Sequence, residues 1–447
     1  MAKPPPLRAT SSGELPIDRA LELSSASDSE GALRIVVPLV KADLGSPAPL
    51  FVLGRELHAL GHRGPAVAAL EVAADRASDA GNLPMAIAAV AELSSMNADV
   101  SARIERIAKV YSRGSGFIRK TGASLPPGGA KGDVAPLPAT LAGAPLVAQA
   151  TQILEYARAA LDSEREAQTA PPPVPAQNLF SSLTAPALRA LLGAFQVKTV
   201  AKGRKVIEQG VPGAEAFVLA RGELEVVREQ EEGEPMLLAR LGNGALFGEM
   251  ALLSRSPRAA TVLAARPSVV LMISVQALEK VAEDAPEVGK AFAAYCHRRM
   301  VANLVRTSPL LGPLSAGERQ ALIERFSART FETGQKLILQ GKESDGIYVI
   351  ASGEVSVCRT DEAVVIARLG VGEVVGEVSM VFRRASNADV VADHPTMTLF
   401  LPRARFMEIV REHPTLLAQL YELAVRRDDE TTSIVAQEAS DADDLII

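Results

Sequence analysis

The second half of this chain carries one pattern of glycines, carboxylates and prolines twice. Four matched pairs define the repeat, the first two displaced by 131 residues and the last two by 128: Gly203 with Gly334, Gly222 with Gly353, Gly248 with Gly376, and Pro286 with Pro414. The change in displacement falls in the acidic, turn-like segment 228–235, where a polar turn can gain residues without disturbing the strands beside it. Two copies of a single fold, each rich in hairpins, are therefore expected in this half.

Each copy has the same predicted order of elements. A short leading helix (183–195 and 316–326) precedes alternating short strands, and a closing helix follows Pro286 or Pro414. In the strands "AFVLARGELEVV" and "GIYVIASGEVSV", a Gly-Glu pair turns one strand into the next. Short antiparallel strands with regular turn glycines predict a β-roll or jelly-roll barrel with helices packed at its ends.

The first 120 residues have a different texture. Ala and Leu at helical spacing run from about Pro16 to Ser112, with turn signals between them, so an all-helical domain is expected. A 34-residue register that starts near Pro47 resembles the tetratricopeptide helix-pair pattern, and a generic Ala-rich helical bundle is the alternative. Either arrangement would expose an extended face for contact with another protein.

Proline- and glycine-rich stretches separate the two halves and flank one predicted helix, 146–164. The stretch "TAPPPVPAQ" at 169–177 is predicted to be a semi-rigid spacer that holds the halves apart. The chain is thus predicted to be a multidomain α + β protein. Its predicted segments are a disordered start (1–15), the helical domain (16–120), a linker with one helix (121–176), a first barrel domain (177–307), a second barrel domain (308–430) and an acidic tail (431–447).

One stretch of the first barrel has a distinctive spacing. "FGEMALLSRSPRAATV", residues 247–262, places Gly248 and Glu249 shortly before Arg258, which small residues follow. This stretch and the duplicated glycines resemble the cyclic nucleotide-binding domains of catabolite activator-type regulators and of regulatory subunits of cyclic-AMP-dependent kinases. The resemblance covers about 177–428 and implies two such domains in tandem. A sheet-edge turn that persists as a relic and binds nothing is the alternative.

The chemistry of these residues agrees with that resemblance. A guanidinium presents two parallel donors to a phosphate, so Arg258 suits a cyclic phosphodiester. Glu249 only accepts hydrogen bonds, which suits a ribose 2′-hydroxyl, and a helical turn at 250–252 would point backbone N–H groups at the anion. The predicted ligand-binding residues are Phe247, Gly248, Glu249, Met250, Ala251, Arg258, Ala259, Ala260 and Thr261.

Two further residues bear on the base of the ligand. In the family that the stretch resembles, a threonine directly after the arginine goes with guanine, so Ala259 favours cyclic AMP over cyclic GMP. Tyr295 on the closing helix is a candidate for stacking on the base, although an aromatic residue on an amphipathic helix also suits a hydrophobic core.

The second copy departs from the first at the decisive position. "VGEVSMVFRRASNADV", 375–390, keeps Gly376 and Glu377 but has Ser386 where the first copy has Arg258. A hydroxyl cannot neutralise a buried phosphate, and Asp389 is expected to add negative charge where the anion should lie. This degenerate second site is expected to have lost tight binding, and the domain to serve in packing or transmission.

Composition narrows the function classes. The formal net charge is -6 and no basic patch points to nucleic acid. Two cysteines, Cys296 and Cys358, cannot build a disulfide framework, no Cys or His cluster has metal-ligand spacing, and no apolar run is long enough for a membrane. No catalytic triad, P-loop or carboxylate pair has a plausible scaffold, so neither catalytic residues nor a cofactor are expected. A cytoplasmic protein without nucleic-acid or membrane partners is predicted.

The sequence therefore predicts a non-enzymatic receptor for cyclic AMP. Its closing helix at 286–305 is expected to shift on binding, and the second domain and the N-terminal helices are expected to relay that shift to a protein partner. The alternative is an interaction scaffold whose two barrels are structural only, which would capture its partner with or without nucleotide. A kinase regulatory subunit is less favoured because neither linker holds a pseudosubstrate, and a homodimer is left open.

Overall fold

The computed structural model describes residues 15–119, 134–168, 170–229, 235–250, 252, 257–307, 314–315, 317–318, 322, 325–359, 364–412 and 416–429. The predicted acidic tail, nearly all of the predicted disordered start and most of the second leading helix lie outside these ranges. Over the described residues the chain forms two compact units. The first contains 15–208, 216–247 and 260–291, and the second contains 209–215, 248–259 and 292–429.

The first unit begins with successive helices, each packed on the next. They are α1 (Pro16–Ser25), α2 (Ser29–Ala42), α3 (Pro47–Ala59), α4 (Arg63–Asp79), α5 (Leu83–Ser95) and α6 (Ser101–Tyr111). Local signals set their ends: Asp28 and Asn82 cap α2 and α5 by accepting backbone N–H bonds, and Gly61 and Gly81 adopt the left-handed conformation after α3 and α4. The predicted helical domain is confirmed, while its assignment to the tetratricopeptide class stays a prediction.

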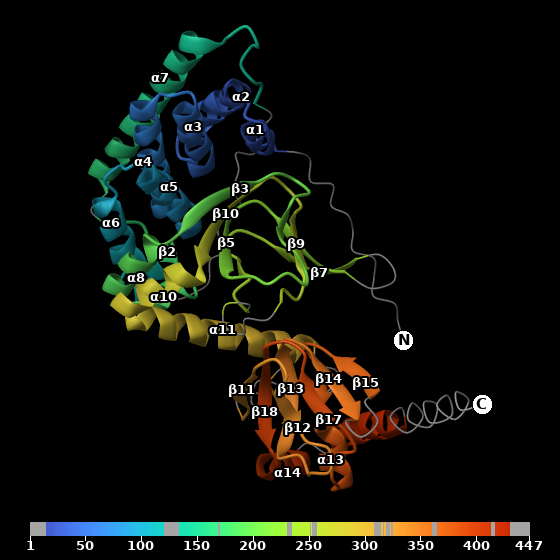
Figure 1. Cartoon of the computed structure of the whole chain (residues 1–447). Helices are drawn as coiled ribbons and strands as arrows, with labels where there is room; N and C mark the ends of the chain where they lie inside the picture. Colours follow the sequence, from blue (N-terminus) through green and yellow to red (C-terminus); the bar gives the residue numbers. More distant parts are fainter. Residues whose placement is uncertain are drawn as a thin grey trace, which may run out of the picture. The chain divides into compact units, whose positions relative to one another are not determined.

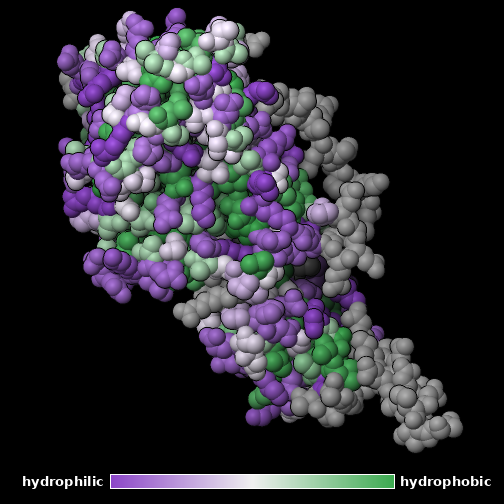
Figure 2. All heavy atoms as spheres, turned by 45° about the horizontal axis from the view of Figure 1, so that its top comes forward, coloured by the Kyte–Doolittle hydropathy of each residue, from purple (hydrophilic) through white to green (hydrophobic). Residues whose placement is uncertain are grey.

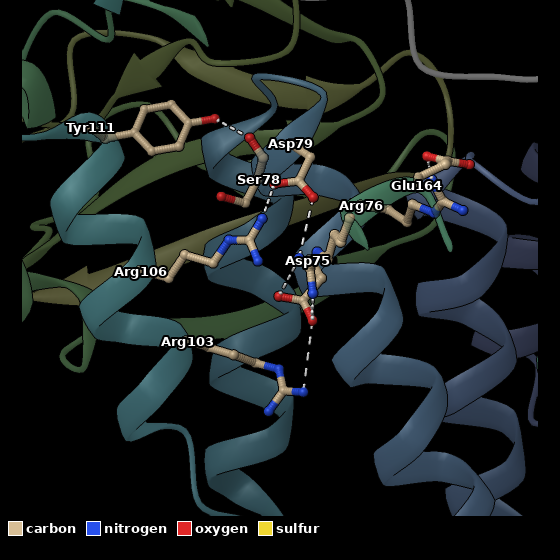
Figure 3. Close-up of polar contacts among 9 residues, drawn as sticks. Asp75, Arg76, Ser78, Asp79, Arg103, Arg106, Tyr111 and Glu164 are labelled. Atoms are coloured by element: carbon tan, nitrogen blue, oxygen red, sulfur yellow. Dashed lines mark hydrogen bonds and ion pairs between the residues drawn. The ribbon is translucent and has the colours of Figure 1, made fainter. Parts of the chain in front are cut away.

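Helix α7 (Gly143–Ala167), which contains the predicted helix 146–164, packs against α2 and α4. A polar network connects the end of α7 to α4, and α4 to α6 (Figure 3). Arg165 of α7 lies 3.1 Å from Asp75 and 3.2 Å from Asp79, and Arg106 of α6 also reaches Asp79, at 2.6 Å. Tyr111 donates its hydroxyl proton to the carbonyl of Ser78 at 2.9 Å, and burial raises the pKa of this tyrosine.

The first barrel consists of two four-stranded antiparallel sheets. Their orders are β3-β10-β5-β8 and β4-β9-β6-β7. The strands are β3 (Gln196–Val200), β4 (Lys205–Ile207), β5 (Glu215–Arg221), β6 (Leu224–Arg228), β7 (Met236–Leu241), β8 (Leu246–Phe247), β9 (Thr261–Ala264) and β10 (Ser268–Ser274). These strands follow helix α8 (Ala185–Leu192) in the chain. They are followed by helices α10 (Val275–Asp284) and α11 (Pro286–Thr307). Phe217, Leu219, Phe247 and Val270 lie in the core between the strands.

A buried ion pair joins the helical domain to this barrel. Asp18 of α1 accepts a hydrogen bond from Arg221 of β5 at 2.6 Å and another from Nε of Arg266 at 2.9 Å. Helices α1 and α5 pack on β3 (Figure 1). Arg55 of α3 also donates a hydrogen bond to Thr199 of β3. The barrel thus contacts α1, α3 and α5, and α7 contacts α2 and α4, so the chain itself covers part of both faces of the helix stack.

The proline-rich spacer is a wrong prediction. Val174 and Pro175 form β2 (Val174–Pro175), which pairs in parallel with β1 (Ile118–Arg119). The side chain of Val174 is buried, and a Cβ atom on Gly81 would lie only 2.6 Å from Cδ of Pro175. The stretch is extended, as proline favours, but it packs on the helical domain instead of spanning free solvent.

The second unit holds the second barrel. Its sheets have the orders β11-β18-β13-β16 and β12-β17-β14-β15, the same arrangement as in the first barrel. The strands are β11 (Ser327–Phe331), β12 (Lys336–Ile338), β13 (Gly346–Ser352), β14 (Val355–Arg359), β15 (Val364–Leu369), β16 (Val374–Val375), β17 (Asp389–Ala392) and β18 (Thr396–Pro402). Helices α13 (Glu377–Phe382) and α14 (Arg403–Glu412) and the helical residues 416–429 accompany them. The prediction of two copies of one β-rich fold is confirmed.

The visible surface is mixed in polarity. On the face drawn in Figure 2, hydrophobic residues form patches that hydrophilic residues interrupt. In the described part of the chain, no helix combines the length and the apolar character that crossing a bilayer requires.

Candidate functional site

The predicted ligand-binding stretch starts directly after β8. Gly248 has φ of +75°, a left-handed conformation that favours glycine, and the backbone turns sharply there. Glu249 follows with only 3% of its surface exposed, and Leu252 donates its backbone N–H to the carbonyl of Glu249 at 3.2 Å. Met250 packs against the core of the second unit, and Ala251 lies outside the described residues.

Arg258 lies over the loop 209–215. Its backbone exchanges two hydrogen bonds with that loop, from Gly210 N–H to its carbonyl at 2.9 Å and from its own N–H to the carbonyl of Val211 at 3.0 Å. The guanidinium donates from Nη1 to the carbonyl of Gly248 at 2.6 Å, and from Nη2 to the carbonyl and carboxylate of Glu215 at 2.8 and 3.3 Å. Only 7% of Arg258 is exposed. The cation is therefore buried, and Glu215 is the acid it contacts.

Burial sets the electrostatics of this cation. Desolvation lowers the pKa of Arg258, and the charges of Glu215 and Glu249 oppose that shift. An arginine remains protonated under such a shift, so Arg258 offers a permanent positive charge in a desolvated site.

Gly213 makes room for the guanidinium. A Cβ atom at this position would lie 2.0 Å from Nε and 2.2 Å from Cζ of Arg258. Any side chain at 213 would therefore displace the guanidinium from its present position. Gly213 is a positioning residue for Arg258 that the sequence-based reasoning did not identify.

Glu249 contacts a different arginine. Nε of Arg299 on α11 lies 3.3 Å from Oε1 of Glu249. Burial raises the pKa of Glu249, and the charges of Arg299 and Arg258 oppose that shift. Cys296, one turn earlier on α11, is fully buried, and burial together with the charge of Glu249 raises the pKa of its thiol to about 12. Glu249 and Arg258 thus belong to two separate ion pairs, Arg258 with Glu215 and Arg299 with Glu249.

The remaining predicted residues lie in different surroundings. The ring of Phe247 stacks on Phe217 in the barrel core, with centroids 5.3 Å apart. Thr261 is buried and donates to Glu229 at 2.9 Å, while Ala259 is exposed and Ala260 half-buried. Tyr295 is buried, and its hydroxyl oxygen accepts a long hydrogen bond of 3.5 Å from Arg299. A stacking role for Tyr295 stays a prediction.

The second site, which the sequence predicts to be degenerate, has the same local backbone as the first. Gly376 has φ of +90°, and Ser386 exchanges the corresponding backbone bonds with Gly341 and Lys342, both at 2.8 Å. Glu377 is buried and pairs with Arg427 at 2.8 Å, as Glu249 pairs with Arg299. The hydroxyl of Ser386 turns back to donate to the carbonyl of Ala388 at 2.7 Å.

The second copy has lost the surroundings of the guanidinium along with the guanidinium itself. At a displacement of 131 residues, Glu215 corresponds to Gly346 and Gly213 corresponds to Ser344. Ser344 is buried, and its hydroxyl donates to the carbonyl of Gly346 at 2.6 Å. The counter-acid and the space for the cation are thus both missing.

Asp389 does not leave an unpaired negative charge at that site. Its carboxylate accepts from Lys336 at 2.7 Å and from the backbone N–H of Gln340 at 2.9 Å. Residue 389 belongs to β17, which pairs with β12, so the side chain reaches the lysine on the neighbouring strand. The expected repulsion of an anion by Asp389 is therefore weakened by a local cation.

Comparison with known proteins connects this geometry to a family. Residues 197–285 and 328–413 match the family model described as the cyclic nucleotide-binding domain. Two segments of the chain, one after the other, thus match the cyclic nucleotide-binding domain. The first domain contains the intact set of Gly248, Glu249 and Arg258, and the second contains Gly376, Glu377 and Ser386.

Two curated proteins show the same resemblance at the level of sequence. The chain is 29% identical over 214 residues to the cAMP-dependent protein kinase regulatory subunit of Yarrowia lipolytica, and the match covers 48% of this chain and 54% of the relative. It is 30% identical over 216 residues to the cAMP-dependent protein kinase type II regulatory subunit of Drosophila melanogaster, with the same two coverages. The chain therefore spans about half the length of these relatives. A solved structure of the regulatory domain of Toxoplasma gondii PKA with cAMP shares 23% identity over 56% of this chain and 92% of that chain, with a TM-score of 0.27.

Proposed function

We propose that this protein is a non-enzymatic receptor for cyclic AMP and that the first cyclic nucleotide-binding domain holds the ligand. The observation that supports this most is the buried guanidinium of Arg258, which lies beside Gly248 within a segment that matches the family. Both curated relatives are regulatory subunits of cAMP-dependent protein kinases. Because each relative is matched over only about half of its length, cyclic AMP as the ligand and regulation of a protein partner are proposed for this chain.

The phosphate of the ligand is assigned to Arg258. A guanidinium has five N–H donors, and the three hydrogen bonds to Gly248 and Glu215 use only Nη1 and Nη2. A cyclic phosphate can take the remaining donors and compete with the carbonyl of Gly248. Charge-assisted bonds of this kind contribute on the order of 1.5 to 3 kcal/mol each.

The ribose is assigned to Glu249, which links the ligand to α11. Its carboxylate accepts hydrogen bonds from a 2′-hydroxyl, and Arg299 of α11 already contacts the same carboxylate. A ligand that changes this contact favours one position of α11 over another, to the extent of its differential affinity for the two. A protein partner would read that change through the second domain and the N-terminal helical domain.

Isothermal titration of the full chain with cyclic AMP tests the proposal. We expect one ligand to bind per chain. Arg258→Ala should weaken binding at least tenfold and up to about a thousandfold, because a buried charge pair is broken. Glu249→Ala should weaken binding and cyclic GMP should bind less well. Ser386→Ala in the second domain is the matched control and should leave the isotherm unchanged. Absence of heat at millimolar ligand, or wild-type affinity in Arg258→Ala, would favour the interaction scaffold instead.

A further inference from the structure

A cleft separate from both cyclic nucleotide-binding sites lies within the first unit. Its lining residues come from the end of α5, from α6, and from the turn from α8 into β3. Its volume is about 320 Å³, within the range of sites that hold small organic molecules. Val90, Ile104, Leu192 and Phe195 contribute apolar walls. The cleft therefore offers apolar contact from the helical domain on one side and from the first barrel on the other.

One acid lies among these apolar walls. Glu92, in the last turn of α5, lines the cleft, and its side chain is 18% exposed. Nε of Arg55 lies 3.1 Å from Oε1 of Glu92, and within the described residues no other cation comes within ion-pair distance of this carboxylate. Burial raises the pKa of Glu92, and the charges of Arg55 and His58 oppose that shift.

The rest of the lining also favours a positive charge. α5 ends at Ser95, so the negative end of its dipole faces this region, and no described residue of the lining is basic. Ser94, Ser95 and Gln196 add neutral polar groups at the rim. The cleft thus combines apolar walls with an acceptor-rich end, where the carboxylate of Glu92 already contacts Arg55 on one side.

We propose that this cleft binds a small organic cation, an amine or amidinium carried on an apolar ring or chain. The cationic group pairs with the carboxylate of Glu92, and the apolar body lies between Ile104 of α6 and Leu192 of α8. Such an occupant contacts the helical domain and the barrel together, and it stabilises their joint fold by mass action. This site does not depend on the cyclic nucleotide-binding function.

Benzamidine, a flat amidinium, and benzamide, its neutral analogue of the same shape, are the probes for this site. Both are titrated into the full chain by ligand-observed NMR and by thermal unfolding. We expect benzamidine to bind at least tenfold more tightly than benzamide and to raise the melting temperature. Equal affinities for the two probes, or no benzamidine binding at millimolar concentration, would overturn the proposal.

Two variants locate the binding. Glu92→Gln should weaken benzamidine to the level of benzamide, and Ile104→Trp, which fills the cleft from α6, should abolish binding of both. Val365→Trp, at an exposed position of β15, is the matched control and should bind benzamidine like the wild type. Unchanged binding in Ile104→Trp, or equal loss in Val365→Trp, would show that the probe does not occupy this cleft. Cyclic AMP affinity in Ile104→Trp should stay unchanged, which separates this result from a failure of the receptor proposal.

Discussion

Arg299 of α11 contacts the buried carboxylate of Glu249, with Nε 3.3 Å from Oε1. The second domain repeats this contact between Arg427 and Glu377 at 2.8 Å, and both residues are displaced by 128 positions. The contact is therefore part of the shared architecture of the two copies. In the first copy this contact is accompanied by Arg258, whereas the second copy has Ser386 at the matching position.

The Arg299 contact predicts how cyclic AMP affinity depends on pH. Glu249 binds the ribose most strongly when ionised, because a charged acceptor makes the stronger hydrogen bond. Burial raises its pKa above the ordinary value of 4.5, so affinity should fall as pH drops through that raised pKa. Arg299→Gln removes the largest opposing charge and should move the fall in affinity to higher pH. Titrations at a series of pH values measure this.

The second domain supplies the control for that experiment. Arg427→Gln breaks the corresponding contact with Glu377 and should leave the pH profile of cyclic AMP binding unchanged. Glu249→Gln cannot ionise and should flatten the profile at reduced affinity. If Arg299→Gln leaves the profile where it was, Glu249 is not the group that controls binding.

Gly213 predicts a loss of binding without any change to a charged group. A methyl group at this position would overlap the guanidinium of Arg258, because its carbon would lie only 2.0 Å from Nε. Gly213→Ala should therefore weaken cyclic AMP binding at least tenfold, because a displaced guanidinium loses part of its interaction with the phosphate. Gly242→Ala is the matched control, because a Cβ there meets nothing within 4 Å. Equal affinity of the two variants would mean that Arg258 binds from another position.

The repeated glycines allowed the two barrels to be predicted from sequence. Gly222 and Gly353 turn one strand into the next with φ of 117° and 87°, a region that favours glycine, so their repetition reports repeated turns. The pairing of Glu249 with Arg299 was missed because the two residues are far apart in sequence and no local pattern links them. The same 128-residue displacement that relates Glu249 to Glu377 also relates Arg299 to Arg427, and extending the repeat to the closing helices would have revealed it.

The composition of a segment did not predict which parts of the protein it packs against. The prolines at 171–175 correctly indicated an extended chain, but the burial of Val174 and the approach of Pro175 to Gly81 depend on the helical domain. Gly213 and Glu215 precede the recognised stretch and lie beside Arg258 only after the loop has folded. Sequence reasoning thus identified the cation but not the residues that hold it.

The second domain should resist repair by a single substitution. Ser386→Arg restores the guanidinium, but Ser344 carries a side chain where Gly213 leaves space, and Gly346 offers no carboxylate in place of Glu215. A carboxylate cannot be added at 346 without a shift, since a Cβ there would lie 2.1 Å from the carbonyl oxygen of Leu401. Titration of Ser386→Arg with cyclic AMP should still give one ligand per chain. A stoichiometry of two would show that the arginine alone is sufficient.

The buried Asp18 predicts that the helical domain and the first barrel unfold together. Asp18 neutralises Arg221, which is 4% exposed, and it also accepts from Arg266. Asp18→Ala leaves the guanidinium of Arg221 buried without its acid, which should lower the free energy of unfolding by about 3 to 5 kcal/mol. Glu225→Ala is the comparison at the surface, where Glu225 pairs with Arg240 at 2.9 Å and the Arg240 side chain is 54% exposed. Its loss should lower the free energy of unfolding by less than about 1 kcal/mol. Urea unfolding followed by far-ultraviolet circular dichroism compares the two variants, and similar small losses in both would mean that α1 contributes little to holding the barrel.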